Sequence, residues 1–209
     1  MKTIFFGLLT LVAMAANANA LDGLEAFVKN AKSGRSQFTQ VVTAPPKDAQ
    51  PARTKTSVGT FEFSRPNRFK FVYTKPFAQT IVADGQTLWL YDADLNQVTA
   101  RNQSAVLGST PAALIASAAD LKALKSDFNL AVAPDKDGLE WVVATPRVKD
   151  GALQSVHVGM RGAELAVLEI LDSFGQRSVI TFAAMQTNPS LDASAFTFKP
   201  PAGADVVRQ

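Results

Sequence analysis

The chain has 209 residues, of which 47% are hydrophobic and 19% charged, a composition typical of one globular domain rather than of a disordered or fibrous protein. Its formal net charge of +3 comes from 21 basic and 18 acidic residues scattered along the chain, so the charge does not indicate a nucleic-acid-binding protein. Because the chain has no cysteine, it forms no disulfide and carries no lipid on a cysteine of its own.

The first twenty residues have the pattern of a secretory signal peptide. Lys2 provides a positive charge, residues 4–16 form a short apolar run, and Ala18-Asn19-Ala20 matches the small-x-small cleavage pattern. The apolar run is shorter than the ~20 residues that a membrane span needs. We therefore expect cleavage after Ala20 and one domain over residues 21–209; an uncleaved N-terminal anchor is the alternative.

Two segments have apolar residues at helical spacing. The first has Leu21, Leu24, Phe27, Val28 and Ala31, with Asp22 and Glu25 as a start signal. The second starts at Thr110, a good N-cap, with Pro111 at the first helical position. It continues through residues 112–116, and a further turn is predicted over Asp120 to Lys125.

Short β-strands are predicted in two groups. The first group comprises Val58–Ser64, Arg68–Thr74, Ala78–Ala83, Thr87–Tyr91 and Asn96–Arg101. The second comprises Phe128–Val132, Leu139–Thr145, Leu153–Gly159, Ala166–Leu171 and Arg177–Phe182. Turn residues such as Asp84-Gly85 and Asp137-Gly138 separate the strands, so the pattern predicts an antiparallel sandwich or barrel. The segment from Ala44 to Ser57, rich in Pro, Lys and Ala, is predicted to be a mobile loop.

Catalytic, metal-binding and cofactor-binding motifs are missing from the sequence. The single histidine, His157, lies in a predicted strand, where a structural role is the expected one. We find no zinc-ligand spacing, no phosphate-binding glycine loop and no nucleophile elbow. The sequence therefore predicts a protein that is not an enzyme and that holds neither a metal nor a cofactor.

An aromatic surface is the most informative feature of the predicted sheet. Side chains alternate along a strand, so Phe61 and Phe63 share one face, as do Phe69, Phe71 and Tyr73 on the next strand. Either Leu88 and Leu90 or Trp89 and Tyr91 extend this surface on a later strand. An ordinary aromatic core and a ligand-binding cavity both fit the pattern.

Arg65 is expected on the same face as Phe61 and Phe63, at the rim of the aromatic surface. A guanidinium in that position needs hydrogen-bond acceptors, because an unpaired buried charge costs several kcal/mol or more. The last carbonyls of a helix are unsatisfied and carry partial negative charge, so they would serve. This predicts a helical lid held by Arg65; a solvated arginine beside a proline turn is the alternative.

Several sequence fragments, in their order along the chain, resemble the LolA family of outer-membrane lipoprotein carrier proteins. These are Arg65-Pro66-Asn67-Arg68-Phe69, Pro76-Phe77, Asp84-Gly85-Gln86-Thr87-Leu88-Trp89-Leu90-Tyr91, Asn96-Gln97-Val98-Thr99, Thr110-Pro111 and the closing Phe196-Thr197-Phe198-Lys199-Pro200-Pro201. The resemblance covers nearly all of the chain after residue 20. Phe71 stands where the family often has tryptophan, which keeps the position apolar.

The resemblance implies a fold that is mainly β with helices: an incomplete, strongly curved antiparallel β-barrel covered by a lid of short helices. It implies a monomeric periplasmic carrier for acylated lipoproteins, with an inner-membrane ABC transporter and an outer-membrane receptor lipoprotein as partners. Arg65 falls on the family's lid-closing arginine. The candidates for acyl-chain binding are Phe61, Phe63, Phe69, Phe71, Trp89, Leu114 and Ile115. A lipid-sensing half-barrel domain of an envelope stress regulator is the alternative, and a lipid-ester hydrolase is disfavoured by the single histidine.

Overall fold

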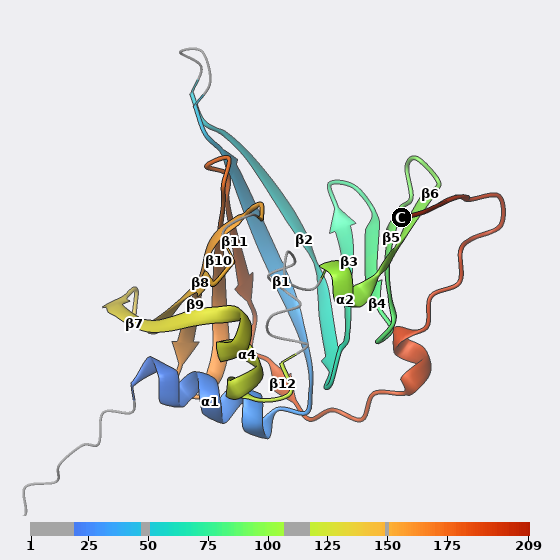
Figure 1. The fold of residues 1–209 in the computed structure, drawn as a ribbon. Helices are drawn as coiled ribbons and strands as arrows, with labels where there is room; N and C mark the ends of the chain where they lie inside the picture. Colours follow the sequence, from blue (N-terminus) through green and yellow to red (C-terminus); the bar gives the residue numbers. More distant parts are fainter. Residues whose placement is uncertain (1–18, 47–50, 107–117, 149–150) are drawn as a thin grey trace, which may run out of the picture.

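The computed structural model describes residues 19–46, 51–106, 118–148 and 151–209 (Figure 1). The predicted helix that starts at Thr110, with Leu114 and Ile115, lies outside the described residues. The helices are α1 (Ala20–Asn30), α2 (Gln103–Val106), α4 (Leu121–Asp127) and the 3₁₀ helix η2 (Ala193–Phe196). The strands are β1 (Ser33–Ala44), β2 (Arg53–Ser64), β3 (Arg68–Lys75), β4 (Gln79–Ala83), β5 (Thr87–Asp92), β6 (Gln97–Asn102), β7 (Phe128–Lys136), β8 (Leu139–Pro146), β9 (Leu153–Arg161), β10 (Glu164–Asp172), β11 (Arg177–Phe182), β12 (Gln186–Thr187) and β13 (Asp205–Arg208).

One open sheet contains every strand of the described residues. Its order is β13-β6-β5-β4-β3-β2-β1-β11-β10-β9-β8-β7, with β12 paired to β1. The end strands β13 and β7 do not pair with each other, so within the described part of the chain the sheet curves without closing (Figure 1). All pairs are antiparallel except β13 with β6. The predicted fold, mainly β with an incomplete antiparallel barrel, is confirmed.

The ten predicted strands are all present, but the strand β1 and the start of β2 were not predicted. The predicted loop from Ala44 to Ser57 is wrong at its two ends, because Ala44 pairs with Arg53 and Gln40 pairs with Ser57 in one long hairpin. Residues 47–50 lie outside the described part. The first five residues of β2 are polar or only partly buried, so they lack the apolar alternation that marks a half-buried strand.

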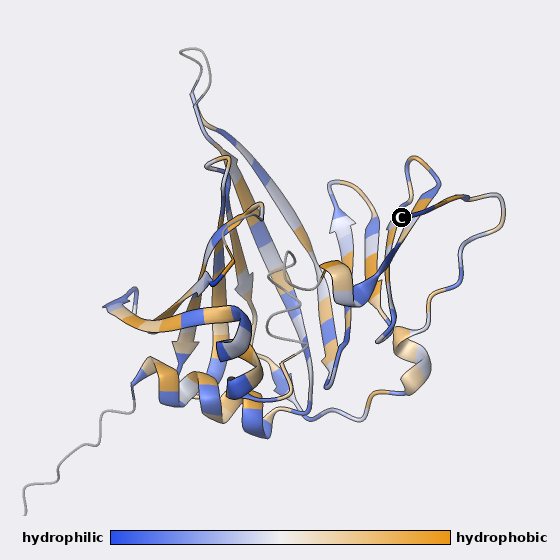
Figure 2. Ribbon diagram, in the orientation of Figure 1, coloured by the Kyte–Doolittle hydropathy of each residue, from blue (hydrophilic) through white to orange (hydrophobic). Residues whose placement is uncertain are grey.

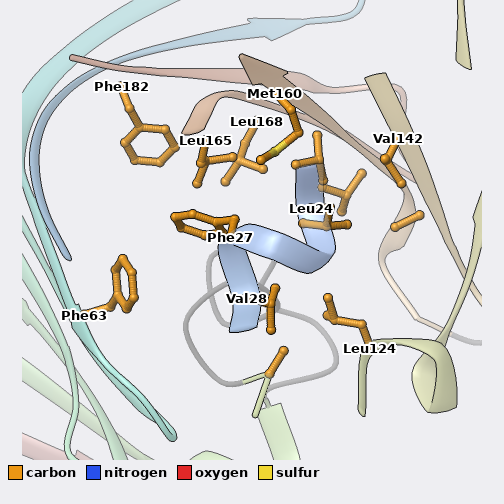
Figure 3. Close-up of a cluster of buried hydrophobic side chains, with 14 of the residues drawn as sticks. Leu24, Phe27, Val28, Phe63, Leu124, Val142, Met160, Leu165, Leu168 and Phe182 are labelled. Atoms are coloured by element: carbon orange, nitrogen blue, oxygen red, sulfur yellow. The ribbon is translucent and has the colours of Figure 1, made fainter. Parts of the chain in front are cut away.

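Helix α1 begins one turn earlier than the predicted start signal indicates. Its N-cap is Asn19, whose side chain accepts hydrogen bonds from the backbone N–H groups of Leu21 and Asp22, and the carboxylate of Asp22 accepts one from the backbone N–H of Asn19. This is a capping box, so Asp22 closes the cap rather than opening it. The helix places one apolar side against the sheet, with Leu24, Phe27 and Val28 almost fully buried (Figure 3).

We call the sheet face that carries Phe61 and packs on α1 the inner face, and the opposite face the outer face. Hydrophobic and hydrophilic residues alternate along most strands, as expected when one face of the sheet is more buried than the other (Figure 2). The main core joins the inner face to α1 and α4. On the outer face the C-terminal segment runs back across the sheet through η2, where Phe196 is buried, and ends as β13 beside β6.

Candidate functional site

Four phenylalanine side chains form the centre of the inner face. Phe61 lies opposite Phe71, and Phe63 opposite Phe69, in the β2–β3 register. The Phe61 and Phe71 rings lie 4.4 Å apart between centroids, and the four side chains are at most 2% exposed. The predicted aromatic surface is therefore present, and the structure brings these four residues together.

Helix α1 covers this phenylalanine cluster, defined as Phe61, Phe63, Phe69 and Phe71. The ring of Phe27 meets that of Phe63 edge-on at 6.0 Å, and both belong to the main core. Leu24 and Val28 point into the same core, between α1 and the far strands of the sheet (Figure 3). In this state the interior is occupied by side chains of the protein itself, because the helix supplies the apolar groups that cover the cluster.

Arg65 joins this helical cover to the sheet. It follows β2 at the turn that leads into β3, and its Nε donates a hydrogen bond to the carbonyl oxygen of Ala31 at 2.9 Å. Ala31 is the C-cap of α1, so the acceptor is one of the carbonyls that a helix end leaves free. Nη1 of Arg65 donates to the carbonyl oxygen of Ala118 at 2.8 Å, just before α4. Arg65 therefore makes the expected hydrogen bond to a carbonyl at a helix end, Ala31 of α1, whereas Ala118 precedes the N-cap of α4. That these bonds hold a lid closed stays a prediction.

The guanidinium of Arg65 lies in an apolar setting. It stands 5.0 Å from the ring centroid of Phe63 and 5.5 Å from that of Phe27, within cation–π range. Burial lowers the pKa of Arg65 to about 10, which leaves the group charged at neutral pH. Its Nη2 is buried without a hydrogen-bond partner. Two carbonyl oxygens and two aromatic rings therefore contact the guanidinium of Arg65.

Trp89 lies away from the phenylalanine cluster. Its indole N–H donates to Asp84 at 2.9 Å, and its ring packs on Phe198 of the C-terminal segment at 5.5 Å. Leu88, the residue before Trp89, points to the opposite face of β5 and packs against the main core. The prediction that Trp89 faces the interior is therefore corrected: Leu88 takes the inner position on β5. Leu114 and Ile115 lie outside the described residues.

A family model described as "Outer membrane lipoprotein carrier protein LolA" matches residues 29–199, which include Arg65 and the whole phenylalanine cluster. The chain belongs to the LolA family. An outer-membrane lipoprotein carrier protein of Albidiferax ferrireducens is 67% identical over 98% of this chain and 99% of its own length. Another, of Methylibium petroleiphilum, is 52% identical over 99% of this chain and 98% of its own. The crystal structure of a LolA superfamily protein from Nitrosomonas europaea has 14% identity and a TM-score of 0.48, covering 86% of this chain and 98% of that one.

In the described residues, no helix combines the length and the apolar character that crossing a bilayer requires.

Arg65 and one of its two acceptors were predictable from the sequence. The carbonyl of Ala31 follows from the helical pattern that ends near it, whereas Ala118 lies between two predicted helical segments and carries no signal. Leu88 was one of two open alternatives, and its inner position depends on the β4–β5 register, in which it lies opposite Ala83. The register was not predictable, because β5 alternates leucine with aromatic residues and is apolar on both faces.

Proposed function

We propose that this chain carries lipoproteins through the periplasm to the outer membrane, with their acyl chains held between the inner face of the sheet and the helical cover. The observation that carries the proposal is the phenylalanine cluster, closed by a helix that one incompletely satisfied arginine holds in place. Such a cover can be exchanged for a lipid, because acyl chains offer the same apolar contacts as Leu24, Phe27 and Val28. Leu88, which packs against this core, extends the proposed lining.

The energy of acylation explains why such a carrier is needed. At about 0.8 kcal/mol for each buried methylene, three acyl chains of about fifteen methylenes each hold a lipoprotein to a membrane by some 35 kcal/mol. No lipoprotein leaves a bilayer at a useful rate against that energy. A carrier lowers the cost by offering a comparable apolar environment in water.

Loading also needs a source of energy outside this chain. The closed state already satisfies the phenylalanine cluster, so a lipid must displace α1 and break the bonds of Arg65 before it gains its own contacts. The sequence contains no nucleotide-binding motif to drive that step. We infer that an inner-membrane ABC transporter loads the carrier and that an outer-membrane receptor lipoprotein unloads it, with the carrier a monomer between them.

Release of the exported chain from the inner membrane would follow the predicted cleavage after Ala20. The mature chain would then start inside the first turn of α1 and lose the N-cap Asn19. Helix α1 would consequently be held by its packing and by Arg65 more than by its own cap, which suits a cover that has to move.

The proposal is tested by the transfer of an acylated lipoprotein from membrane vesicles that contain the releasing transporter. Purified carrier should remove the lipoprotein in stoichiometric amount, and a fluorescent fatty-acyl probe should bind the carrier and be displaced by a lipopeptide. The matched control is the same cargo without its acyl chains, which should neither be carried nor displace the probe. Equal binding of acylated and unacylated cargo would overturn acyl recognition.

A further inference from the structure

The inner face has a second, polar zone beyond the phenylalanine cluster. The strand registers place Gln40 and Ser57 opposite each other on β1 and β2, and Gln79 opposite both Tyr73 and Asp92 on β3, β4 and β5. Directly opposed residues of antiparallel strands project from the same face. These side chains, together with Lys55, line a groove of about 540 Å³. The lining at this end of the inner face is mixed rather than purely apolar, because Val42 of β1 and the ring of Tyr73 lie among these polar side chains.

The groove lies at the end of the sheet away from the helical cover. In Figure 1, α1 and α4 lie at one end of the curved sheet, and the β1–β2 hairpin extends past the other end. Tyr73 marks the boundary between the two zones, because its ring stacks with Phe71 and meets Phe38 edge-on at 5.0 Å. Two apolar side chains on neighbouring loops, Phe77 and Leu95, are 56% and 71% exposed and also border the groove.

The groove offers polar groups to a peptide backbone, and apolar side chains, Val42, Phe77 and Leu95, to the side chains of such a peptide. Within the described residues, the side chains of Ser57 and Gln79 make no hydrogen bond, so their donors and acceptors are available. Gln40 donates to the hydroxyl of Ser178 at 2.7 Å, which leaves its amide oxygen free to accept. The charged groups have both signs: the ammonium of Lys55 is 4.5 Å from the ring centroid of Phe77, and Asp92 and Asp94 supply carboxylates.

We propose that this groove binds the polypeptide segment that directly follows the acylated cysteine of a cargo lipoprotein. The inference rests on the proposed function and deepens it. Gln79 is two residues from Ile81, which lies opposite Phe71. Two residues of a strand span about 7 Å, so a lipid whose head group points towards this end of the sheet would place its acylated cysteine beside the polar zone. The N-terminus of a lipoprotein then matches both zones. Its acyl chains would contact the phenylalanine cluster, and its backbone amides would contact Gln40, Ser57 and Gln79.

The order of the two zones along the strands favours one orientation of the cargo, with its acyl chains on the phenylalanine cluster and its peptide in the groove. A lipid inserted the other way would place its peptide amides among the phenylalanines, where unsatisfied polar groups are strongly disfavoured. The correct orientation leaves the folded part of the cargo at the open end of the sheet, past Phe77 and Leu95. The polar zone therefore selects lipoproteins over free fatty acids, which have no peptide to place there.

Two ligands with the same lipid separate peptide recognition from acyl recognition. One is a triacylated cysteine methyl ester, and the other is the same triacylated cysteine followed by four neutral residues. The variants are Gln79→Ala and the bulkier Gln79→Trp on the inner face, with Thr80→Ala, the neighbouring residue on the opposite face of β4, as the matched control. Losing one or two hydrogen bonds lowers affinity about two- to tenfold.

We expect the parent and Thr80→Ala to bind the lipopeptide more tightly than the methyl ester. Gln79→Ala should lose that preference, Gln79→Trp should reverse it, and both should bind the methyl ester as the parent does. A photo-reactive amino acid at position 79 should crosslink to the peptide portion, and the same group at position 80 should not. Equal affinity of the parent for the two ligands, or crosslinks from position 79 to the acyl chains, would overturn the inference. Failure of the parent to bind the methyl ester would instead overturn the proposed function.

Discussion

Arg65 and Ala31 link the turn between β2 and β3 to the C-terminal end of α1 through one hydrogen bond of 2.9 Å. The same guanidinium reaches Ala118, so one side chain holds two parts of the helical cover against the sheet. Both acceptors are backbone carbonyls, which no substitution of Ala31 or Ala118 can remove. These two hydrogen bonds are therefore removed by changing Arg65 itself.

Arg65→Leu should bind acyl chains more tightly than the parent. Hydrogen bonds from a charged donor contribute roughly 1.5–3 kcal/mol, so their loss raises the open fraction about ten- to a hundredfold, and apparent affinity rises with it while closed forms dominate. Delivery should slow, because closing no longer helps to expel the lipid. Probe titration and transfer of a loaded lipoprotein to acceptor membranes measure the two effects.

Arg68→Leu is the matched control, since Arg68 is exposed at the same turn and should change neither quantity. Arg65→Lys keeps the charge but lacks the fork that reaches two carbonyls, so it should lie between the parent and Arg65→Leu. Weaker acyl binding by Arg65→Leu, with normal delivery of bound cargo, would show that Arg65 does not close the cover.

Glu62 holds an ion-pair network on the outer face. Its carboxylate accepts from Arg35 at 2.6 Å and Lys70 at 2.9 Å, and Lys70 also donates to the carbonyl oxygen of Ala195 in η2. Burial alone would raise the pKa of Glu62, but the hydrogen bonds and positive charges of Lys70 and Arg35 lower it below its ordinary value. A carboxyl whose folded pKa is depressed stabilises the fold above its unfolded pKa and loses that contribution as the pH falls.

Glu62→Gln should therefore lower the free energy of unfolding at pH 7 by about 1–3 kcal/mol. The parent should lose this stability below about pH 4.3, the ordinary value for glutamate, and the difference between the two proteins should shrink there. Urea unfolding from pH 7 to pH 3 measures it. Glu169→Gln is the control, because its pair with Arg177 is more exposed and should contribute less than about 1 kcal/mol. A constant difference across the pH range would contradict the assignment.

His157 should have no part in carrier activity. It is half-buried on β9, paired with Val143 and Glu169, on the face opposite its buried neighbours Val156 and Val158. His157→Gln should leave transfer within about a factor of two, as expected for a surface change below ~0.5 kcal/mol. Loss of transfer by a folded His157→Gln protein would revive a catalytic interpretation.

The sequence was sufficient for the strands whose inner and outer residues differ in polarity. β2 beyond Val58 and β3 show that alternation and were predicted within one residue at their ends. β1 was missed because its inner positions include Gly34, Ser36 and Gln40, which do not read as an apolar face. Gly34 is small for a reason visible only in space: a Cβ there would lie 2.3 Å from the ring of Phe63.

The parts of the site that depend on the chemistry of a single residue were predictable, whereas the parts that depend on strand pairing and long-range contacts were not. Arg65 at the end of a phenylalanine strand requires acceptors wherever it lies, so physics pointed to helix ends before the fold was known. The position of Trp89 depends instead on which face of β5 meets the core, and on Phe198, more than a hundred residues away in the chain. Long-range partners of this kind leave no local pattern.

Tryptophan fluorescence can locate bound acyl chains directly. The chain has two tryptophans, Trp89 against Phe198 on the outer face and Trp141 in a separate small cluster with Leu139 and Ala166. Neither belongs to the main core that contains the phenylalanine cluster. Phe71→Trp adds a third indole at the centre of the inner face, at an overpacking cost of about 1–3 kcal/mol.

A fatty acid brominated along its chain quenches only the tryptophans that it contacts. If acyl chains replace the helical cover on the inner face, the emission added by Phe71→Trp should be lost on binding, while that of Trp89 and Trp141 persists. The same fatty acid without bromine should leave all three unquenched, which separates contact from a change of conformation. Phe198→Ala, which uncovers Trp89, should not make Trp89 sensitive to the brominated chain. The opposite result is quenching of Trp89 or Trp141 in the parent together with no quenching of the added indole in Phe71→Trp. That result would place the lipid on the outer face and reject the inner-face site.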